Sequence, residues 1–161
     1  MWASPPGRGW SILEWRTAVP QKITTSVKSM VEAAKREIEE IEAADAVKVA
    51  GRNDVVLVDL RDPRELERDG KVPGAFRMTR GMLEFWIDPE SPYFKPVFGE
   101  DKKFVFFCAG GLRSALAAKT AQDMGLKPVA HILGGFKAWK EAGGPVEGPE
   151  LMPGEGKPQK K

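Results

Sequence analysis

The sequence predicts an α/β fold in which a parallel β-sheet is flanked by helices on both faces. Three short apolar segments, residues 55–60, 104–107 and 129–133, have the β-branched and aromatic content of buried strands. Residues 63–68 are expected to begin a helix after the first strand, and residues 114–124 to form a helix after the second. Strands that alternate with helices are typical of parallel sheets with right-handed crossovers. Ligands of such sheets bind outside the carboxyl ends of the strands, and we expect the functional residues there.

Residues 25–42 precede the first strong strand and are predicted to form a charged helix. Their apolar residues lie three and four positions apart, a stripe expected to pack on the domain: Val27, Met30, Val31, Ala34, Ile38 and Ile41. A second interpretation gives residues 39–41 to a short entry strand and residues 43–50 to the helix that follows it. The sequence leaves both open.

The chain of 161 residues is long enough for one domain with its own hydrophobic core. We expect a Pro- and Gly-punctuated extension over residues 1–24, a helix over 25–40, one domain over 41–149 and a flexible basic tail over 150–161. A short helix is expected at residues 81–87, where an aromatic face either lines the site or packs in the core.

Composition excludes several classes of function. Hydrophobic residues make up 42% of the chain, charged residues make up 30%, and the net charge is +2. No stripe of Lys and Arg with exposed aromatics stands out, so a nucleic-acid partner is not expected. The N-terminus lacks the apolar stretch of a secretory signal and no segment has transmembrane length, so we expect a cytoplasmic protein with no membrane partner.

Cys108 is the only cysteine and His131 the only histidine. One cysteine excludes an intramolecular disulfide, and one of each cannot build a Cys/His zinc site. We therefore expect no metal. Because His131 lies inside an apolar strand, it is predicted to pack or to bond locally rather than to be the catalytic partner of Cys108.

The segment KFVFFCAGGLRS, residues 103–114, is predicted to run from a strand through a glycine-rich loop into a helix. Gly110 and Gly111 are expected to take positive φ and to turn amide N–H groups inward, which makes an anion site. Arg113 adds a positive charge and is expected to face solvent. Together these groups favour a thiolate at Cys108, which would be reactive near neutral pH. The alternative is an inert cysteine in the core.

Other residues near the predicted strand ends have two interpretations each. Asp59 and Arg61 either form a pair that supports the loop from beneath, or Asp59 caps a turn while Arg61 pairs on the surface. Ser114 either caps the helix or donates its hydroxyl to a bound sulfur species. Gly134 and Gly135 are predicted to form a tight turn after the third strand.

Three segments in order resemble the rhodanese-like (sulfurtransferase) family. Residues 108–113 are similar to its six-residue loop, in which the active cysteine comes first. The segments VVLVDLRDPREL (55–66) and GKVPGA (70–75) are similar to its early signature, and LGGFKAWKEAGGPV (133–146) to its closing one. The resemblance covers roughly residues 41–149.

The resemblance implies a sulfurtransferase that carries sulfane sulfur as a persulfide on Cys108, with Arg113 as the second catalytic residue and Asp59 and Arg61 in support. The residues implied to hold the sulfur are Ala109, Gly110, Gly111, Leu112, Arg113 and Ser114. The partners would be a small-molecule or protein sulfur donor, such as thiosulfate or a persulfide, and a thiol acceptor. No metal or organic cofactor is required, because covalent catalysis divides the transfer into two steps.

The sequence departs from the family's pattern at two positions, and two alternative functions remain open. Lys71 stands where the family commonly has histidine, a position interpreted as structural. Ala109 stands where many thiosulfate-using members have a second cation, which argues against thiosulfate as the donor. A phosphatase or arsenate reductase uses a similar loop, but the phosphatase branch has one residue more than the four between Cys108 and Arg113. The remaining alternative is a non-catalytic interaction module.

Overall fold

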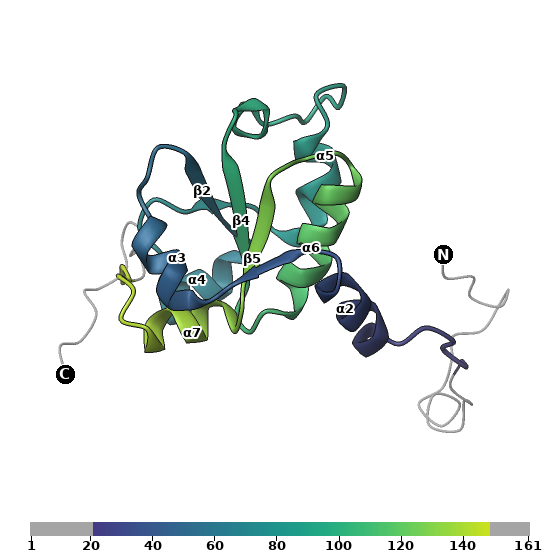
Figure 1. The fold of residues 1–161 in the computed structure, drawn as a ribbon, viewed down its shortest axis with the longest axis horizontal. Coiled ribbons are helices and arrows are strands. Elements are labelled where there is room, and N and C mark those ends of the chain that lie inside the picture. The colour runs from purple at the N-terminus through teal and green to yellow at the C-terminus, as the bar shows by residue number, and fades with distance from the viewer. Residues whose placement is uncertain (1–20, 149–161) are drawn as a thin grey trace, which may run out of the picture.

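The computed structural model describes residues 21–148, and a five-stranded parallel sheet lies at its centre (Figure 1). The order of the strands in the sheet is β1-β5-β4-β2-β3. The strands are β1 (Glu39–Ile41), β2 (Val55–Asp59), β3 (Phe76–Arg77), β4 (Lys103–Phe107) and β5 (Val129–Ile132). The predicted extension, up to residue 20, and the predicted tail lie outside the described residues.

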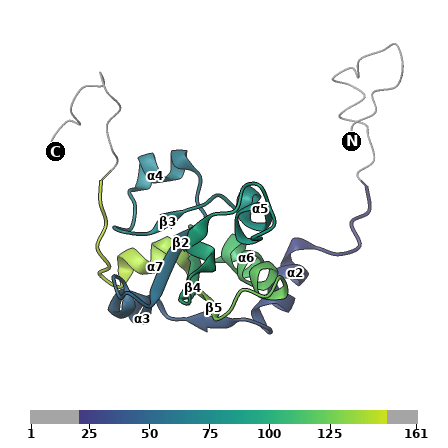
Figure 2. The same cartoon turned by 90° about the horizontal axis from the view of Figure 1, so that it is seen from above.

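Helices cover both faces of this sheet, as predicted (Figure 2). They are α2 (Val27–Lys35), α3 (Ala43–Val49), α4 (Pro63–Asp69), α5 (Leu83–Ile87), α6 (Leu112–Asp123) and α7 (Gly135–Glu141), with short 3-10 turns η1 (Arg80–Met82) and η2 (Pro96–Gly99). Helices α2, α5 and α6 pack on one face, and α3 and α7 pack on the other. Within residues 21–148, no helix has the length and hydropathy needed to cross a membrane.

The second interpretation of residues 25–42 is confirmed, because α2 ends early and β1 and α3 follow it. The stripe on this segment packs only in part. Val31 and Ala34 are buried, whereas the Val27 and Met30 side chains at the start of α2 remain exposed. The expectation that the whole stripe is packing surface is therefore wrong for its first turn.

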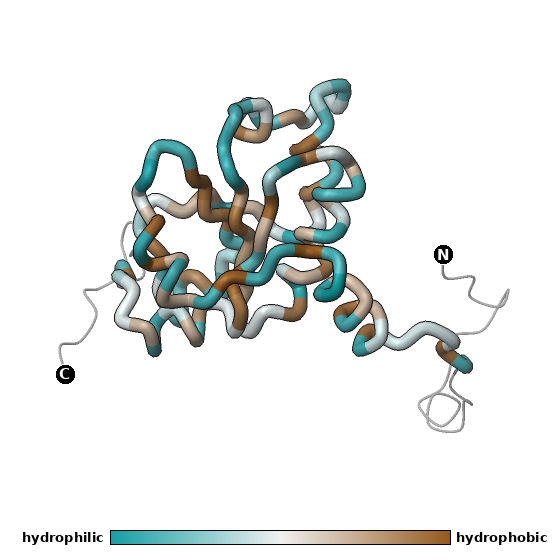
Figure 3. Tube along the Cα trace, in the orientation of Figure 1, coloured by the Kyte–Doolittle hydropathy of each residue, from teal (hydrophilic) through white to brown (hydrophobic). Residues whose placement is uncertain are grey.

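The central strand β4 is buried on both faces, which explains its uninterrupted apolar sequence. Phe104 and Phe106 face the cluster that includes α2, α5 and α6, and Val105 and Phe107 face the cluster of α3 and α7. Figure 3 shows the hydrophobic residues along the central strands and hydrophilic residues in the surrounding loops. The strand that leads to the predicted site is thus fixed from both sides.

Helix α6 begins at Leu112, two residues before the predicted start. Gly111 is its N-cap and has a left-handed φ of 101°. An L side chain rarely takes this conformation, so glycine permits the sharp change from strand to helix. Leu112 and Arg113 consequently belong to the first helical turn rather than to a free loop.

Candidate active site

The predicted site residues gather at the carboxyl edge of β2 and β4. Asp59, the last residue of β2, pairs in register with Phe107, the last residue of β4. The chain leaves β2 toward β3 on one side and returns as β4 on the other, which makes this edge a topological switch point. Ligand sites of open parallel sheets lie at such points. Cys108 is the first residue beyond β4 and therefore lies at this position.

The Cys108 thiol lies in the bend between β4 and α6 and is only 1% exposed. Its Sγ accepts a hydrogen bond from the backbone N–H of Gly111 at 3.1 Å. The hydroxyl of Ser114 lies 3.6 Å from the same sulfur. Among the predicted loop amides of residues 109–114, that of Gly111 is the one that donates to the sulfur in the described structure. The sulfur therefore sits at the base of the loop, in contact with the helix that follows.

Gly110 differs from its neighbour and from the sequence-based expectation. Positive φ angles are found at Gly111 but not at Gly110. Gly110 is exposed, and a Cβ atom added there would meet nothing within 4 Å. The expectation that both glycines need left-handed backbone is therefore wrong for Gly110, which instead leaves open space at the outer side of the loop.

The start of α7 holds the backbone of the loop in place. The carbonyl oxygen of Cys108 accepts a hydrogen bond from the Phe136 N–H at 2.7 Å, and that of Ala109 accepts one from the Lys137 N–H at 3.2 Å. Gly135 makes this approach possible, because a Cβ atom there would overlap the Cys108 carbonyl oxygen. The predicted tight turn after β5 thus has a second consequence, which is to position the cysteine.

Asp59 and Arg61 form a fully buried ion pair, so the interpretation of Arg61 as a surface residue is wrong. Arg61 Nη2 donates to Asp59 Oδ2 at 2.7 Å and to the carbonyl oxygen of Gly70 at 3.0 Å. The Arg61 guanidinium also lies 3.8 Å from the centre of the Phe136 ring. The Phe136 N–H holds the backbone of Cys108. The ion pair therefore supports the loop indirectly, through its contact with Phe136.

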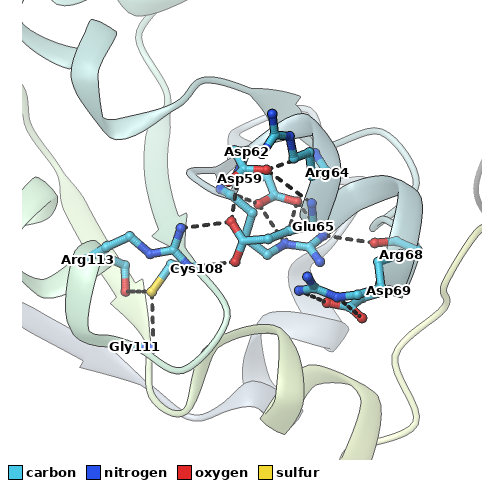
Figure 4. A network of polar contacts seen from close by, with 12 residues as sticks. Asp59, Asp62, Arg64, Glu65, Arg68, Asp69, Cys108, Gly111 and Arg113 are labelled. Carbon is cyan, nitrogen blue, oxygen red and sulfur yellow. Dashed lines mark hydrogen bonds and ion pairs between the residues drawn. The ribbon is translucent and has the colours of Figure 1, made fainter.

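Arg113 is paired with Glu65 of α4 rather than facing solvent alone (Figure 4). Its Nη1 and Nη2 donate to the two carboxylate oxygens at 2.9 and 2.8 Å. The Arg113 side chain is 41% exposed, and that of Glu65 is 14% exposed. Hydrogen bonds from Arg113 are the main reason why the pKa of Glu65 falls from 4.5 to about 2. Hydrogen bonding to Glu65 in turn raises the pKa of Arg113.

Glu65 is a site residue that the sequence reasoning missed. Asp62 caps α4 by accepting the N–H groups of Arg64 and Glu65, and Glu65 Oε2 accepts the Asp62 N–H at 2.9 Å. This capping box has a local sequence signature, Asp-Pro-x-Glu, which could have placed Glu65 in the first turn of a helix. The contact with Arg113, 48 residues away, has no local signal.

Ser114 does not cap α6, because Gly111 occupies the N-cap position. Its side chain is fully buried and lies between two polar groups, Cys108 Sγ and His131 Nδ1, at 3.6 and 2.9 Å. The prediction that His131 packs in the core is confirmed, since it is 0% exposed. Its bonds are not local, however, because Nε2 lies 2.8 Å from Glu40 Oε2, 91 residues earlier in the chain.

Comparisons with known proteins show which family this domain is similar to. Residues 42–142 match the rhodanese-like domain. A sulfurtransferase of Allochromatium vinosum is 30% identical over 103 residues, which are 64% of this chain and 88% of that protein. The mouse thiosulfate sulfurtransferase/rhodanese-like domain-containing protein 3 is also 30% identical, and the chain spans 58% of its length.

Two solved structures extend the comparison. A Rhodopseudomonas palustris CGA009 protein of unknown function, described as a possible tyrosine phosphatase, is 68% identical with a TM-score of 0.79 over 81% of this chain and 100% of that one. The polysulfide-sulfur transferase homodimer of Wolinella succinogenes is 33% identical with a TM-score of 0.58 over 75% of this chain and 86% of that one. This chain belongs to the rhodanese-like domain family, and proteins named as sulfurtransferases are among its relatives.

Proposed function

We propose that this protein transfers sulfane sulfur through a persulfide on Cys108. The thiolate attacks the outer sulfur of a donor, a new S–S bond forms, and the donor's own bond to that sulfur breaks as its leaving group departs with the electron pair. The product is Cys108–S–S⁻. A thiolate acceptor then attacks the outer sulfur and releases the Cys108 thiolate, so that neither an oxidant nor a reductant is consumed.

The observation that carries this proposal is the position of the sulfur at the base of a short, braced loop. Four residues lie between Cys108 and Arg113. The thiol is nearly buried and its Sγ already accepts the Gly111 N–H. Such a loop suits one added sulfur atom at its mouth better than the tetrahedral oxyanion of a phosphatase. A fixed backbone donor beside the sulfur also stabilises negative charge that develops there.

The charges at the loop mouth favour a persulfide or polysulfide donor over thiosulfate. Ala109 contributes no charge, and the Arg113 guanidinium is paired with the Glu65 carboxylate. A thiosulfate dianion therefore meets a largely neutralised site. Each Arg113 nitrogen that bonds Glu65 keeps a second N–H, which is enough to orient the terminal sulfur of a less charged donor. The polysulfide-sulfur transferase of Wolinella succinogenes supports the same class of donor.

Partners follow from this chemistry. The donor is a small-molecule or protein persulfide, and the acceptor is a thiol. Persulfide exchange through a single free thiol suits a reducing compartment, and the cytoplasmic location stays a prediction.

The test is a comparison of sulfur transfer to a thiol from a glutathione persulfide donor and from thiosulfate. We expect transfer with both donors to be abolished in Cys108→Ser, and the persulfide donor to have the higher kcat/KM in the wild type. Hydrolysis of aryl phosphates should be negligible. Aryl phosphate hydrolysis that requires Cys108, without sulfur transfer, would overturn the proposal in favour of a phosphatase.

A further inference from the structure

A continuous line of polar contacts runs from the candidate nucleophile through the protein interior to the surface. Cys108 Sγ lies 3.6 Å from Ser114 Oγ, which lies 2.9 Å from His131 Nδ1. His131 Nε2 lies 2.8 Å from Glu40 Oε2, and the same oxygen lies 3.7 Å from Lys35 Nζ. Ser114 and His131 are fully buried, whereas the Glu40 and Lys35 side chains are 26% and 36% exposed. The sulfur-transfer steps described above assign no role to these contacts.

The fold specifies each contact with a different element. Glu40 and His131 are register partners on β1 and β5, so their side chains project from the same face of the sheet. Ser114 comes from the first turn of α6, directly over that face. On the other side of β5, His131 pairs in register with Phe106, which is apolar and fully buried. The imidazole therefore has one polar neighbour toward Cys108 and one toward the surface.

The neighbours of His131 fix the direction of the hydrogen bonds. Burial is the main reason why the pKa of His131 is lowered, although Glu40 opposes this effect. The neutral ring carries one proton, and the Glu40 carboxylate can only accept, so that proton lies on Nε2. Nδ1 then accepts the Ser114 hydroxyl proton. The Ser114 oxygen is left as an acceptor for the Cys108 thiol.

We propose that His131 is a positioning residue that takes up the Cys108 thiol proton through Ser114 and holds it against Glu40. The proposal deepens the proposed sulfur transfer and rests on it. It identifies the group that receives the proton when the buried thiol becomes the attacking thiolate.

The proton balance is closed within the protein. The S–H bond of Cys108 breaks as Ser114 Oγ takes its proton, and the hydroxyl proton of Ser114 passes to His131 Nδ1. The result is a thiolate and an imidazolium, with Ser114 Oγ now donating to Sγ and Nδ1 donating to Ser114 Oγ. The total charge of the buried groups is unchanged, and the Glu40 carboxylate faces the new cation. Persulfide formation then proceeds without release of a proton to solvent.

The two titrations should consequently be coupled. The charged groups with an electrostatic effect on His131 are Glu40, which raises its pKa, and Lys35, which lowers it. An ionised Cys108 adds a negative charge on the Ser114 side. Loss of that charge should lower the pKa of His131.

Because the chain has one histidine, the imidazole can be followed by NMR without assignment ambiguity. We expect the His131 pKa to fall by about one pH unit when Cys108 is blocked with iodoacetamide or replaced in Cys108→Ala. Glu40→Gln should also lower it. Glu39→Gln is the matched control, because Glu39 lies on the same strand but pairs with Lys103, outside this line of contacts, and it should leave the value unchanged.

Alkylation of the single thiol gives the second measurement. We expect Ser114→Ala and Glu40→Gln to slow the reaction of Cys108 with iodoacetamide at pH 7 by about tenfold, while Glu39→Gln reacts like the wild type. In the wild type, the alkylation rate plotted against pH should have an inflection at the His131 pKa measured by NMR. This inflection should be absent in Ser114→Ala. A role for His131 in packing alone would alter melting temperature without moving this profile.

A wild-type His131 titration that is the same before and after the thiol is blocked would overturn the proposal, and this comparison needs no substitution. Unchanged alkylation in folded Ser114→Ala would overturn it as well. Neither measurement uses a sulfur donor. A protein that transfers sulfur without proton transfer to His131 can therefore be distinguished from one that passes the proton to His131 but transfers no sulfur.

Discussion

Arg113 in the first turn of α6 and Glu65 in the first turn of α4 form a two-point ion pair that ties the two helix starts together. Each of these helices follows a strand whose last residues, Asp59 and Phe107, are register partners. The pair therefore closes the loop around Cys108 across the carboxyl edge of the sheet. Its strength should decide both how stable this edge is and how the loop meets an anionic donor.

The first prediction concerns pH and stability. The pKa of Glu65 is about 2 in the folded protein, against 4.5 ordinarily. A carboxyl group whose pKa is depressed by folding contributes stability above the ordinary pKa, and this is lost as pH falls toward the folded value. We expect the contribution of Glu65 to disappear between pH 4.5 and about 2. It should amount to about 2 kcal/mol at neutral pH, after allowance for the solvent around Arg113.

Chemical denaturation of the wild type and Glu65→Gln from pH 7 to pH 2 measures this contribution. The difference in the free energy of unfolding should be largest at pH 7 and shrink through the acidic range. Asp69→Asn is the control, because its pair with Arg68 is largely exposed and should contribute little. Parallel curves for the wild type and Glu65→Gln would contradict the assignment.

The second prediction concerns Arg113 itself. Arg113→Ala should lower kcat/KM for sulfur transfer by something like ten- to a hundredfold, because the loop loses the N–H groups that orient the donor's terminal sulfur and the bonds to Glu65. It should also destabilise the fold by about 1–2 kcal/mol, because the nearly buried Glu65 carboxylate loses its partner. Arg113→Lys should recover part of both losses, since the charge remains but the planar two-point geometry does not.

Steady-state kinetics and thermal melts of the three proteins test this prediction. Arg68→Ala serves as the control for loss of a surface arginine, and its stability should stay close to that of the wild type. Wild-type turnover in Arg113→Ala would mean that the loop acts through its backbone alone.

The third prediction compares two glycines next to the active loop. Gly135→Ala should be strongly destabilising, by more than about 2 kcal/mol, because the new Cβ overlaps the Cys108 carbonyl oxygen and Gly135 has positive φ. Gly110→Ala should stay within about 0.5 kcal/mol of the wild type, because it has neither constraint. Thermal melts of the two variants test this prediction. Equal changes in melting temperature would show that α7 does not brace the loop.

The fourth prediction concerns the support beneath the loop. Asp59→Asn leaves the fully buried Arg61 guanidinium without its counterion and should cost about 3–5 kcal/mol. Asp54→Asn removes a carboxylate from an exposed pair with Arg52 and should cost far less. The free energies of unfolding from urea titrations give both values. A small loss in Asp59→Asn would show that the buried pair is dispensable.

The fold and the position of Cys108 could be predicted from the sequence because both depend on local patterns. The apolar runs of β2, β4 and β5 are recognisable as buried strands, and the predicted parallel sheet is confirmed. Strand β3 was not predicted, because two residues in an irregular region carry no periodicity. The sequence does not define the end of α2 for a similar reason, since β1 has three residues and is defined by its pairing with β5.

The parts of the site that were missed depend on contacts between distant segments. Glu65 belongs to a recognisable capping box, but nothing near it indicates that Arg113 will reach it. The sequence predicts a core position for His131, and only the register of β1 with β5 brings Glu40 beside it. The pairing of Arg61 with Asp59 is one of the two interpretations that the sequence allows, whereas the burial of Arg61 against Phe136 follows from tertiary packing.

The mass of the intact protein after incubation with a persulfide donor tests the central claim most directly. The chain has one cysteine, so sulfur loading can occur at a single thiol. We expect the wild type to gain the mass of one sulfur atom and to lose it, by stoichiometric transfer, when a thiol acceptor is added. The Cys108→Ser variant should gain no mass. A wild-type protein that retains a reactive Cys108 thiol but acquires no sulfur under these conditions would contradict the account.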